Sequence, residues 1–176
     1  MKNWRDISCL ENGDLKQKEV FEAINSSGIF EMLAGFDPIL TGTYPIGIYL
    51  SASDIDIICC FENADAFLER LQSSFSPFHD FETKTKTIRG IQSVIGRFEY
   101  AGFLFEIFGQ AIPVEKQHAY RHMVIEYTIL SSNDHSFRKR VLELKQKGLS
   151  TEKAFAILLE IEGDPYTGLL GYGAGV

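Results

Sequence analysis

Two aspartates, Asp54 and Asp56, carry the clearest chemical signal in the sequence, because only one residue separates them. On a β-strand, residues i and i+2 share a face, so both carboxylates project together while Ile55 and Ile57 turn into the core. Two neighbouring carboxylates at the edge of an apolar strand repel each other. A hard divalent cation such as Mg²⁺ resolves this repulsion, because it takes oxygen ligands and bridges to substrate phosphates. The pair therefore predicts a metal site.

A third carboxylate, Glu106, interrupts the apolar segment 103–108. A lone charge there is costly unless it is paired or bound to a metal. If this segment lies beside the strand of the aspartates, the three carboxylates converge and can hold two metal ions about 3.5–4 Å apart, as used for in-line nucleotidyl transfer. Glu106 could instead form a structural ion pair with Arg89 or Arg97, and either arginine could bind a triphosphate.

A glycine segment, Gly42–Gly47, precedes the aspartates. Eleven residues separate Gly42 from Asp54, enough for a short excursion that returns to the same edge of a sheet. Gly42 lets the backbone turn tightly and approach a ligand closely. Thr43 offers a hydroxyl, and the backbone N–H groups after it can point at phosphate oxygens. The segment is therefore predicted to bind phosphates.

Together these features resemble the signature of the polymerase-β-like nucleotidyltransferase superfamily over residues 36–110. The segments that match are Gly42-Thr43, Ser53-Asp54-Ile55-Asp56 and the apolar strand around Glu106. The resemblance implies that the glycine segment grips the triphosphate of an NTP donor and that Ser53 belongs to the same nucleotide-binding set. It also implies that the two aspartates bind Mg²⁺ or Mn²⁺, and that Glu106 completes the metal site and can act as general base.

The whole chain also resembles a bacterial family known only as a domain of unknown function and assigned to this superfamily. The segments that match are Gly42–Gly47, Ser53–Cys59, Gln117–His122 and Gly148–Tyr166. This resemblance supports the fold and implies no substrate. Small antibiotic-modifying and antitoxin-type members commonly carry Arg directly before the second glycine, where this chain has Ile46. The chain is therefore not assigned to those subgroups.

Strands and helices that position these residues follow from the hydrophobic periods of the chain. Strands are predicted for a short segment that ends at Gly42 and for residues 55–61, about 80–88, 93–100 and 103–109, with Ala101-Gly102 as a hairpin turn. Helices are predicted after Asn63, from Pro113 onward, after Asn133 or Asp134, after Ser150 or Thr151, and from Asp164-Pro165.

This order predicts an α/β (α+β) fold with a nucleotidyltransferase-like mixed β-sheet and flanking helices. Residues 1–112 are expected to form the core with N-terminal helices, and residues 113–176 a helical C-terminal region packed on it. The helical region is expected to close one side of the cleft, and the two parts to form a single compact unit.

Composition and charge place the chain among ordinary soluble globular proteins. Hydrophobic residues make up 45% of the sequence, and no apolar run approaches the roughly 18–20 residues that span a bilayer. Three cysteines make no disulfide framework and the N-terminus has no secretory signal, so a cytoplasmic location is expected. The formal net charge of −7 argues against extensive non-specific nucleic-acid binding. The basic residues Arg138, Lys139, Arg140, Lys145 and Lys147 are interpreted as a solvated helix face.

Three polar residues, His118, His122 and Glu126, recur every four positions in a helical segment and so share one face. Two histidines four residues apart can bind zinc, but the sequence offers no further ligand. The face could instead line the substrate cleft, or it could simply pack or be solvated. Lys145 and Lys153 could approach the phosphates from the helical region.

The function expected from these features is Mg²⁺-dependent transfer of a nucleoside monophosphate from an NTP to an acceptor, which could be a small molecule, a protein or RNA. The main alternative is a non-catalytic nucleotide-binding or partner-binding module of the same fold, antitoxin-like or regulatory. A third hypothesis is phosphate-ester hydrolysis at the same metals. Retained activity in Asp56→Ala would contradict the enzymatic hypothesis.

Overall fold

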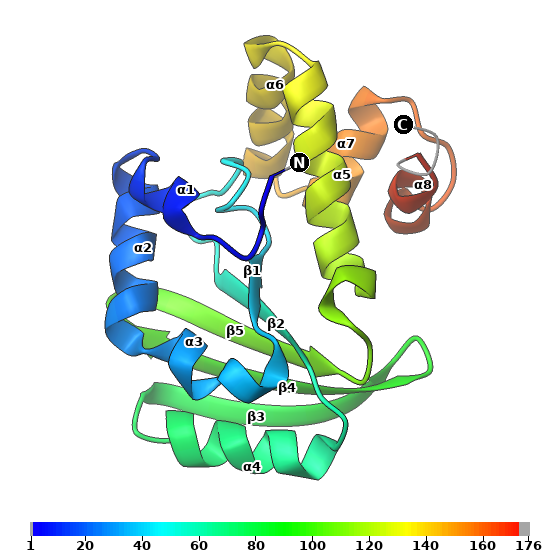
Figure 1. The fold of residues 1–176 in the computed structure, drawn as a ribbon. Coiled ribbons are helices and arrows are strands. Elements are labelled where there is room, and N and C mark those ends of the chain that lie inside the picture. The colour runs from blue at the N-terminus through cyan, green and yellow to red at the C-terminus, as the bar shows by residue number, and fades with distance from the viewer. Residues whose placement is uncertain (1, 173–176) are drawn as a thin grey trace.

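Five strands form one mixed sheet in the order β1-β2-β5-β4-β3 in the computed structural model, which describes residues 2–172 (Figure 1). The strands are β1 (Ile39–Thr41), β2 (Ile55–Cys60), β3 (His79–Ile88), β4 (Ile91–Tyr100) and β5 (Phe103–Gln110). The central strands β2 and β5 run parallel, and the other neighbouring pairs run antiparallel. Together with helices on both sides, this sheet confirms the predicted fold class.

One face of the sheet is apolar and is covered by helices from the first half of the chain. The alternate residues Ile55 and Ile57 of β2 are buried on this face, as their spacing predicted. Helix α4 (Ala64–Phe75) covers β3 and β4 below the sheet in Figure 1. Asn63 accepts a hydrogen bond from the Ala66 N–H at 3.0 Å and so caps α4 as predicted.

The N-terminal elements pack into the same cluster of apolar residues. They are α1 (Ser8–Glu11), α2 (Leu15–Ser27), α3 (Ile29–Met32) and the 3₁₀ turn η1 (Ala34–Phe36). Asp14 and Gln17 form a reciprocal capping box at the start of α2. Val20 and Ile24, one turn apart on α2, are buried in this cluster, so α2 extends the cover that α4 provides.

Helices of the last third of the chain lie above the sheet in Figure 1. They are the 3₁₀ turn η2 (Val114–Lys116), α5 (His118–Ser132), α6 (His135–Gln146), α7 (Thr151–Leu158) and α8 (Pro165–Tyr172). Of the capping residues left open by the sequence, Asp134 caps α6 and Ser150 caps α7. Asp164 accepts a hydrogen bond from the Thr167 N–H at the start of α8.

The prediction of one long helix from Pro113 onward was wrong at its start. Gln117 has an extended backbone (φ −68°, ψ 147°), which ends η2 and delays α5 to His118. Its buried side-chain amide donates to the carbonyls of Cys59 at 2.8 Å and Ile112 at 3.0 Å. These bonds attach the break to the end of β2, a tertiary contact that helical periodicity does not encode.

The buried residues form two main clusters, and the boundary between them only partly coincides with the predicted domain boundary at residue 112. The first lies between the sheet, α2 and α4. The second joins α5, α6, α7 and α8, but it also takes in Trp4, Ile46 and Ile48 from the first part of the chain. The division into 1–112 and 113–176 stays a prediction, and the glycine segment lies at the junction of the two clusters.

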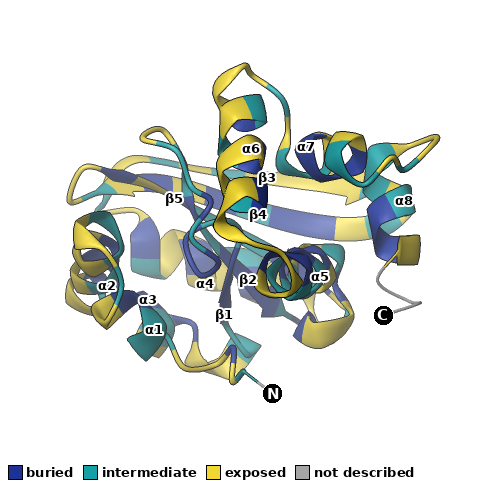
Figure 2. Cartoon of the chain, turned by 90° about the horizontal axis from the view of Figure 1, so that it is seen from above, coloured by how far each residue is buried: buried dark blue, intermediate teal, exposed yellow. Residues whose placement is uncertain are grey.

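Exposed residues mark the outer surfaces of α2 and α6 and much of the edge strand β3 in Figure 2, whereas the central strands are buried. Within residues 2–172, no helix has both the length and the apolar character needed to cross a bilayer.

Gly109 of β5 lets α4 approach the sheet closely, because a Cβ there would lie 2.3 Å from the Phe67 ring. Gly109→Ala should therefore destabilise the fold by about 1–3 kcal/mol through overpacking. Gly96→Ala is the matched control, since its Cβ would meet a movable Leu71 methyl at 3.1 Å. Urea unfolding should give a clearly larger loss for Gly109→Ala, and equal losses would contradict this account of the α4 contact.

Candidate active site

Polar residues occupy one row across all five strands, on the face opposite α4. Thr41 pairs with Asp56, Asp56 with Glu106, Glu106 with Arg97, and Arg97 with Glu82. Directly paired residues on neighbouring strands share a face and have neighbouring side chains. The parallel pairing of β2 with β5 therefore places Asp56 beside Glu106, which meets the condition that the sequence analysis set for these carboxylates to come together.

Asp56 is a strongly perturbed acid in this row. Burial of its carboxyl, followed by repulsion from Asp54 and Glu106, raises its pKa to about 8 against the attraction of Arg97 and Lys145. Asp54 directly precedes β2 and is partly buried. Near neutral pH this site therefore holds a carboxyl that ionises fully only if a cation compensates it.

Glu106 is paired with an arginine. Arg97 donates from Nε to Glu106 Oε2 at 2.7 Å and from Nη2 to the same oxygen, so the ion pair that the sequence left open is present. Arg89 does not pair with Glu106 in this way, and its guanidinium lies 4.1 Å from the centre of the Tyr166 ring. Within residues 2–172, Asp54, Asp56 and Glu106 are not among the groups whose ligand atoms all lie within 4.8 Å. Glu106 thus stands beside the aspartates but turns one oxygen to Arg97.

Gly42 is the point where the backbone passes closest to Asp56. Its φ is +74°, and a Cβ at this position would lie 2.1 Å from Asp56 Oδ2. Only glycine fits both conditions without displacing the carboxylate. The Thr41 hydroxyl, directly before it, is buried and has no hydrogen-bond partner within the described part of the chain.

Thr43 and Ser53 face each other across the excursion between Gly42 and Asp54. Thr43 Oγ1 lies 3.5 Å from Ser53 Oγ, and Ser53 Oγ accepts a hydrogen bond from the Leu50 N–H at 2.9 Å. The Tyr44 hydroxyl donates to the Ser53 carbonyl at 3.1 Å. These bonds close the excursion and return the chain to the edge of the sheet, as the eleven-residue gap predicted.

Two basic residues of α6 bind backbone carbonyls at the end of the glycine segment and directly after it. Arg138 donates to the carbonyls of Ile46 at 2.5 Å and Gly47 at 3.0 Å, and Lys145 donates to the Ile48 carbonyl at 2.7 Å. The interpretation of this basic stretch as a solvated face was wrong for these two residues. Lys145 is buried, and burial lowers its pKa.

The burial of Lys145 could have been predicted from the sequence. It follows Phe137 and Val141 at four-residue steps, so all three share the buried stripe of α6. Lys139, Arg140 and Lys147 lie outside this stripe and are exposed, as predicted.

One cleft of about 720 Å³ joins these parts. All six predicted site residues line it: Gly42, Thr43, Ser53, Asp54, Asp56 and Glu106. The opposite wall comes from the helical region and the β3–β4 turn, and its charged, histidine and tyrosine residues are Arg89, Lys116, His118, His122, Glu126, Lys145, Glu152 and Tyr166. The arrangement can hold a divalent cation at the carboxylates and a polyanion between the glycine segment and the basic side chains. Lys153 is exposed and is not among the lining residues.

Three of these wall residues form a second cluster of ligand-type side chains. His122 and Glu126 of α5 and Glu152 of α7 have ligand atoms that lie within 4.8 Å of one another. His122 and Glu126 share a helix face, as their spacing predicted. Glu152 was missed, because only the tertiary packing of the helical region brings the start of α7 near α5.

A model of the family described as "Domain of unknown function (DUF4269)" matches residues 22–172. No curated protein matches the sequence.

Among solved structures, the Cid1 poly(U) polymerase bound to MgGTP superposes with a TM-score of 0.54 at 18% identity, over 78% of this chain and 45% of that chain. A mutant of Cid1 bound to MgATP gives 0.55 at 17% identity, over 92% and 52%. The polymerase core of TRAMP, an RNA surveillance complex, gives 0.52 at 13% identity, over 89% and 49%. These likenesses show a nucleotidyltransferase-like fold, and the chain spans about half the length of the structures it matches.

The raised pKa of Asp56 predicts how stability depends on pH. Its protonated form stabilises the metal-free fold below pH 4, and this contribution is lost as the pH rises through about 8. Asp56→Asn removes the ionisation, so in a chelator the variant should be more stable than wild type at pH 8–9 by about 1–3 kcal/mol, and this advantage should shrink steadily as the pH falls and be nearly gone at about pH 4.

Thermal and urea unfolding across this pH range measures the difference. Glu62→Gln, at an exposed position, controls for the loss of one negative charge. Parallel pH curves for Asp56→Asn and wild type would show that Asp56 is not the buried, repelled acid described above.

Proposed function

The chain belongs to the family described as domain of unknown function DUF4269, and we propose that it is a divalent-metal-dependent nucleotidyltransferase. It would transfer a nucleoside monophosphate from an NTP to an acceptor hydroxyl or phosphate. The observation that carries this proposal is the contact between Gly42 and Asp56. The Gly42 backbone lies so close to Asp56 Oδ2 that no side chain would fit between them, and the pKa of Asp56 is raised. Both features fit a site that binds a cation and a phosphate chain.

The donor set fits Mg²⁺ or Mn²⁺, because it consists of oxygens alone. Asp54 and Asp56 would hold the cations at the end of β2. Glu106 would contribute its second oxygen, Oε1, while Arg97 keeps Oε2. Bound cations would neutralise the charge that develops on the phosphoryl oxygens.

The chain's own groups would orient the reactants. Backbone N–H groups after Gly42, with the hydroxyls of Thr43 and Ser53, would hold the β- and γ-phosphates. Lys145 and Arg89, on the opposite wall of the cleft, would balance the remaining negative charge.

The reaction would proceed by attack of the acceptor oxygen on the α-phosphorus. The bond from the α-phosphorus to the oxygen bridging it to the β-phosphate breaks, and pyrophosphate leaves. Glu106 would take the acceptor proton on the second lone pair of Oε1, the oxygen that Arg97 leaves free.

The acceptor proposed here is small or locally bound. The solved structures that this chain resembles in fold include a poly(U) polymerase, an RNA terminal U-transferase and the polymerase core of an RNA surveillance complex. This chain carries a formal net charge of −7, which disfavours a long RNA held by many phosphate contacts. A small molecule, a protein side chain or a short RNA end would suit the cleft, and we place the activity in the cytoplasm.

The second candidate function is a non-catalytic nucleotide-binding or partner-binding module. The Arg97–Glu106 ion pair favours it, because it engages the carboxylate that would act as general base. The two functions differ in whether nucleotide bound at the carboxylates is turned over.

Nucleotide binding should stabilise the protein only with metal. An NTP at about one hundred times its dissociation constant adds roughly 2.7 kcal/mol, or roughly 5–10 °C in Tm for a chain of this size. Thermal unfolding with ATP, GTP, CTP and UTP, each with and without Mg²⁺, should show this shift for at least one nucleotide, and Asp54→Ala/Asp56→Ala should lose it.

Glu62→Gln/Asp65→Asn is the control for this measurement, since both residues are exposed and the pair removes the same charge. No shift with any nucleotide, or a shift that survives the double aspartate substitution, would contradict the proposed site.

Turnover separates the enzyme from the binding module. With an α-labelled NTP and Mg²⁺, wild type should release pyrophosphate and transfer label to an acceptor from a metabolite or RNA extract. Glu106→Gln should lower this rate about 100-fold or more while keeping the thermal shift, because a general base contributes about 10²–10⁴-fold. Nucleotide binding in wild type without any pyrophosphate release would favour the non-catalytic module.

A further inference from the structure

His122 is a buried imidazole without the hydrogen bonds that such a group normally makes. It is 4% exposed, and neither ring nitrogen has a partner within residues 2–172. Buried polar atoms are paired in the great majority of cases, so an unpaired imidazole needs a physical explanation. The ring of Tyr166 lies 4.2 Å away between centroids and covers it, but a ring face satisfies neither nitrogen.

Two carboxylates lie against this imidazole. Glu126 is one turn further along α5 and is itself 4% exposed, and Glu152 is in the first turn of α7. The ligand atoms of the three residues lie within 4.8 Å of one another. A buried carboxylate is costly without a partner, and burial and the neighbouring Glu152 raise the pKa of Glu126 well above its usual value.

The charged groups around the cluster leave it short of positive charge. Lys145 faces Glu126 and Glu152, but within residues 2–172 its ammonium donates to the Ile48 carbonyl and forms no ion pair with either carboxylate. Burial of the ring, with smaller effects of His118, Arg121 and Arg89, lowers the pKa of His122 to about 4 against the attraction of Glu152. The imidazole is therefore neutral at physiological pH, the form that binds metals.

We propose that His122, Glu126 and Glu152 form a binding site for a divalent transition-metal ion of the Zn²⁺ type. One imidazole nitrogen with two carboxylates suits such an ion, whereas the oxygen-only donors at Asp54 and Asp56 suit Mg²⁺. The three residues line the cleft, so a fourth coordination position opens towards it. The ion would join α5 to α7 and fix the wall of the cleft opposite the aspartates.

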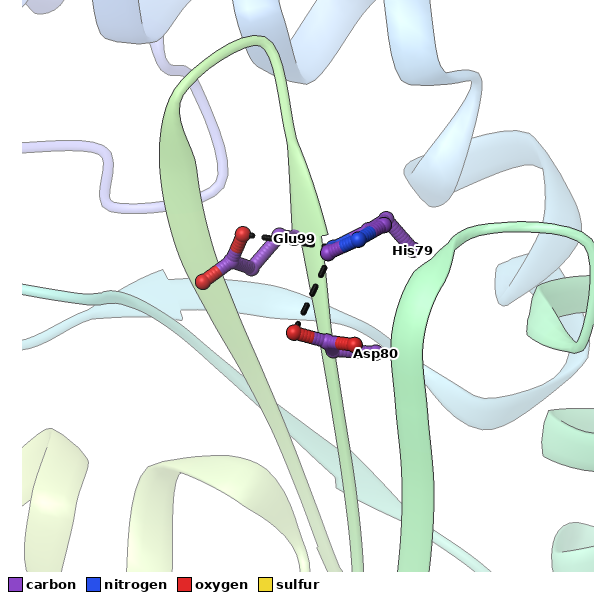
Figure 3. A group of neighbouring side chains, drawn as sticks. All are labelled: His79, Asp80 and Glu99. Atoms are coloured by element: carbon purple, nitrogen blue, oxygen red, sulfur yellow. Dashed lines mark ion pairs between the residues drawn. The ribbon is translucent and has the colours of Figure 1, made fainter.

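A second group of the same residue types shows what distinguishes this cluster. His79, Asp80 and Glu99 also gather within 4.8 Å, at the β3–β4 edge (Figure 3). There His79 Nδ1 lies 3.3 Å from Asp80 and 3.4 Å from Glu99, and the His79 side chain is 73% exposed. All three side chains of that group are exposed, so they can be solvated without an ion, and the group serves as an internal control rather than a site.

Zinc titration of the metal-free protein tests the proposal. In excess Mg²⁺, calorimetry and bound-metal analysis should give one Zn²⁺ per chain, and a Co²⁺-loaded sample should show the visible bands of a histidine-ligated ion. His122→Asn and Glu152→Gln should each weaken Zn²⁺ binding at least about 100-fold, since loss of even an outer partner costs about 10–100-fold. His79→Gln should keep one tight Zn²⁺.

The stoichiometry in Asp54→Asn/Asp56→Asn should also stay at one, which separates this site from the proposed catalytic carboxylates. Unfolding curves in chelator verify that each variant folds, and Glu152→Gln, at a partly buried position, decides the matter if His122→Asn does not fold. Absence of tight Zn²⁺ binding in wild type, or tight binding that persists in folded Glu152→Gln, would overturn the proposal.

Discussion

Repulsion between carboxylates on one face of an apolar sheet is the constraint around which this chain is organised. The parallel register of β2 and β5 sets Asp56 beside Glu106, and Asp54 adds a third negative charge. Arg97 neutralises Glu106, and Gly42 passes where no side chain could fit. Asp56 keeps a strongly raised pKa, so the remaining charge repulsion is concentrated at the point where the glycine segment and the cleft meet.

The helical region matters to this site because it holds the backbone that faces the aspartates. Arg138 and Lys145 bind carbonyls of residues 46–48, and Ile46 and Ile48 are buried with α5–α8 rather than with the sheet. A displacement of α6 would therefore move the glycine segment relative to Asp56. Lys145 also lies between the two acidic clusters, so its charge couples the aspartates to Glu126 and Glu152.

Local signals in the sequence predicted much of this arrangement. The spacing of Asp54 and Asp56, the apolar strand of Glu106 and the cap at Asn63 each reflect a period or a capping preference that neighbouring residues decide. The helix start at His118, the choice of Arg97 for Glu106 and the approach of Glu152 to His122 were not predicted. Each depends on which distant element packs alongside, and a single sequence does not encode that packing locally.

The most direct test of the carboxylate site is to locate its cation. Crystals grown with Mn²⁺ and a non-hydrolysable NTP analogue would give an anomalous difference map at the manganese absorption edge. The account predicts a peak bonded to both Asp54 and Asp56, with the triphosphate running past Gly42 and Thr43. Nucleotide density without manganese at the aspartates, or manganese found only elsewhere in the cleft, would contradict it.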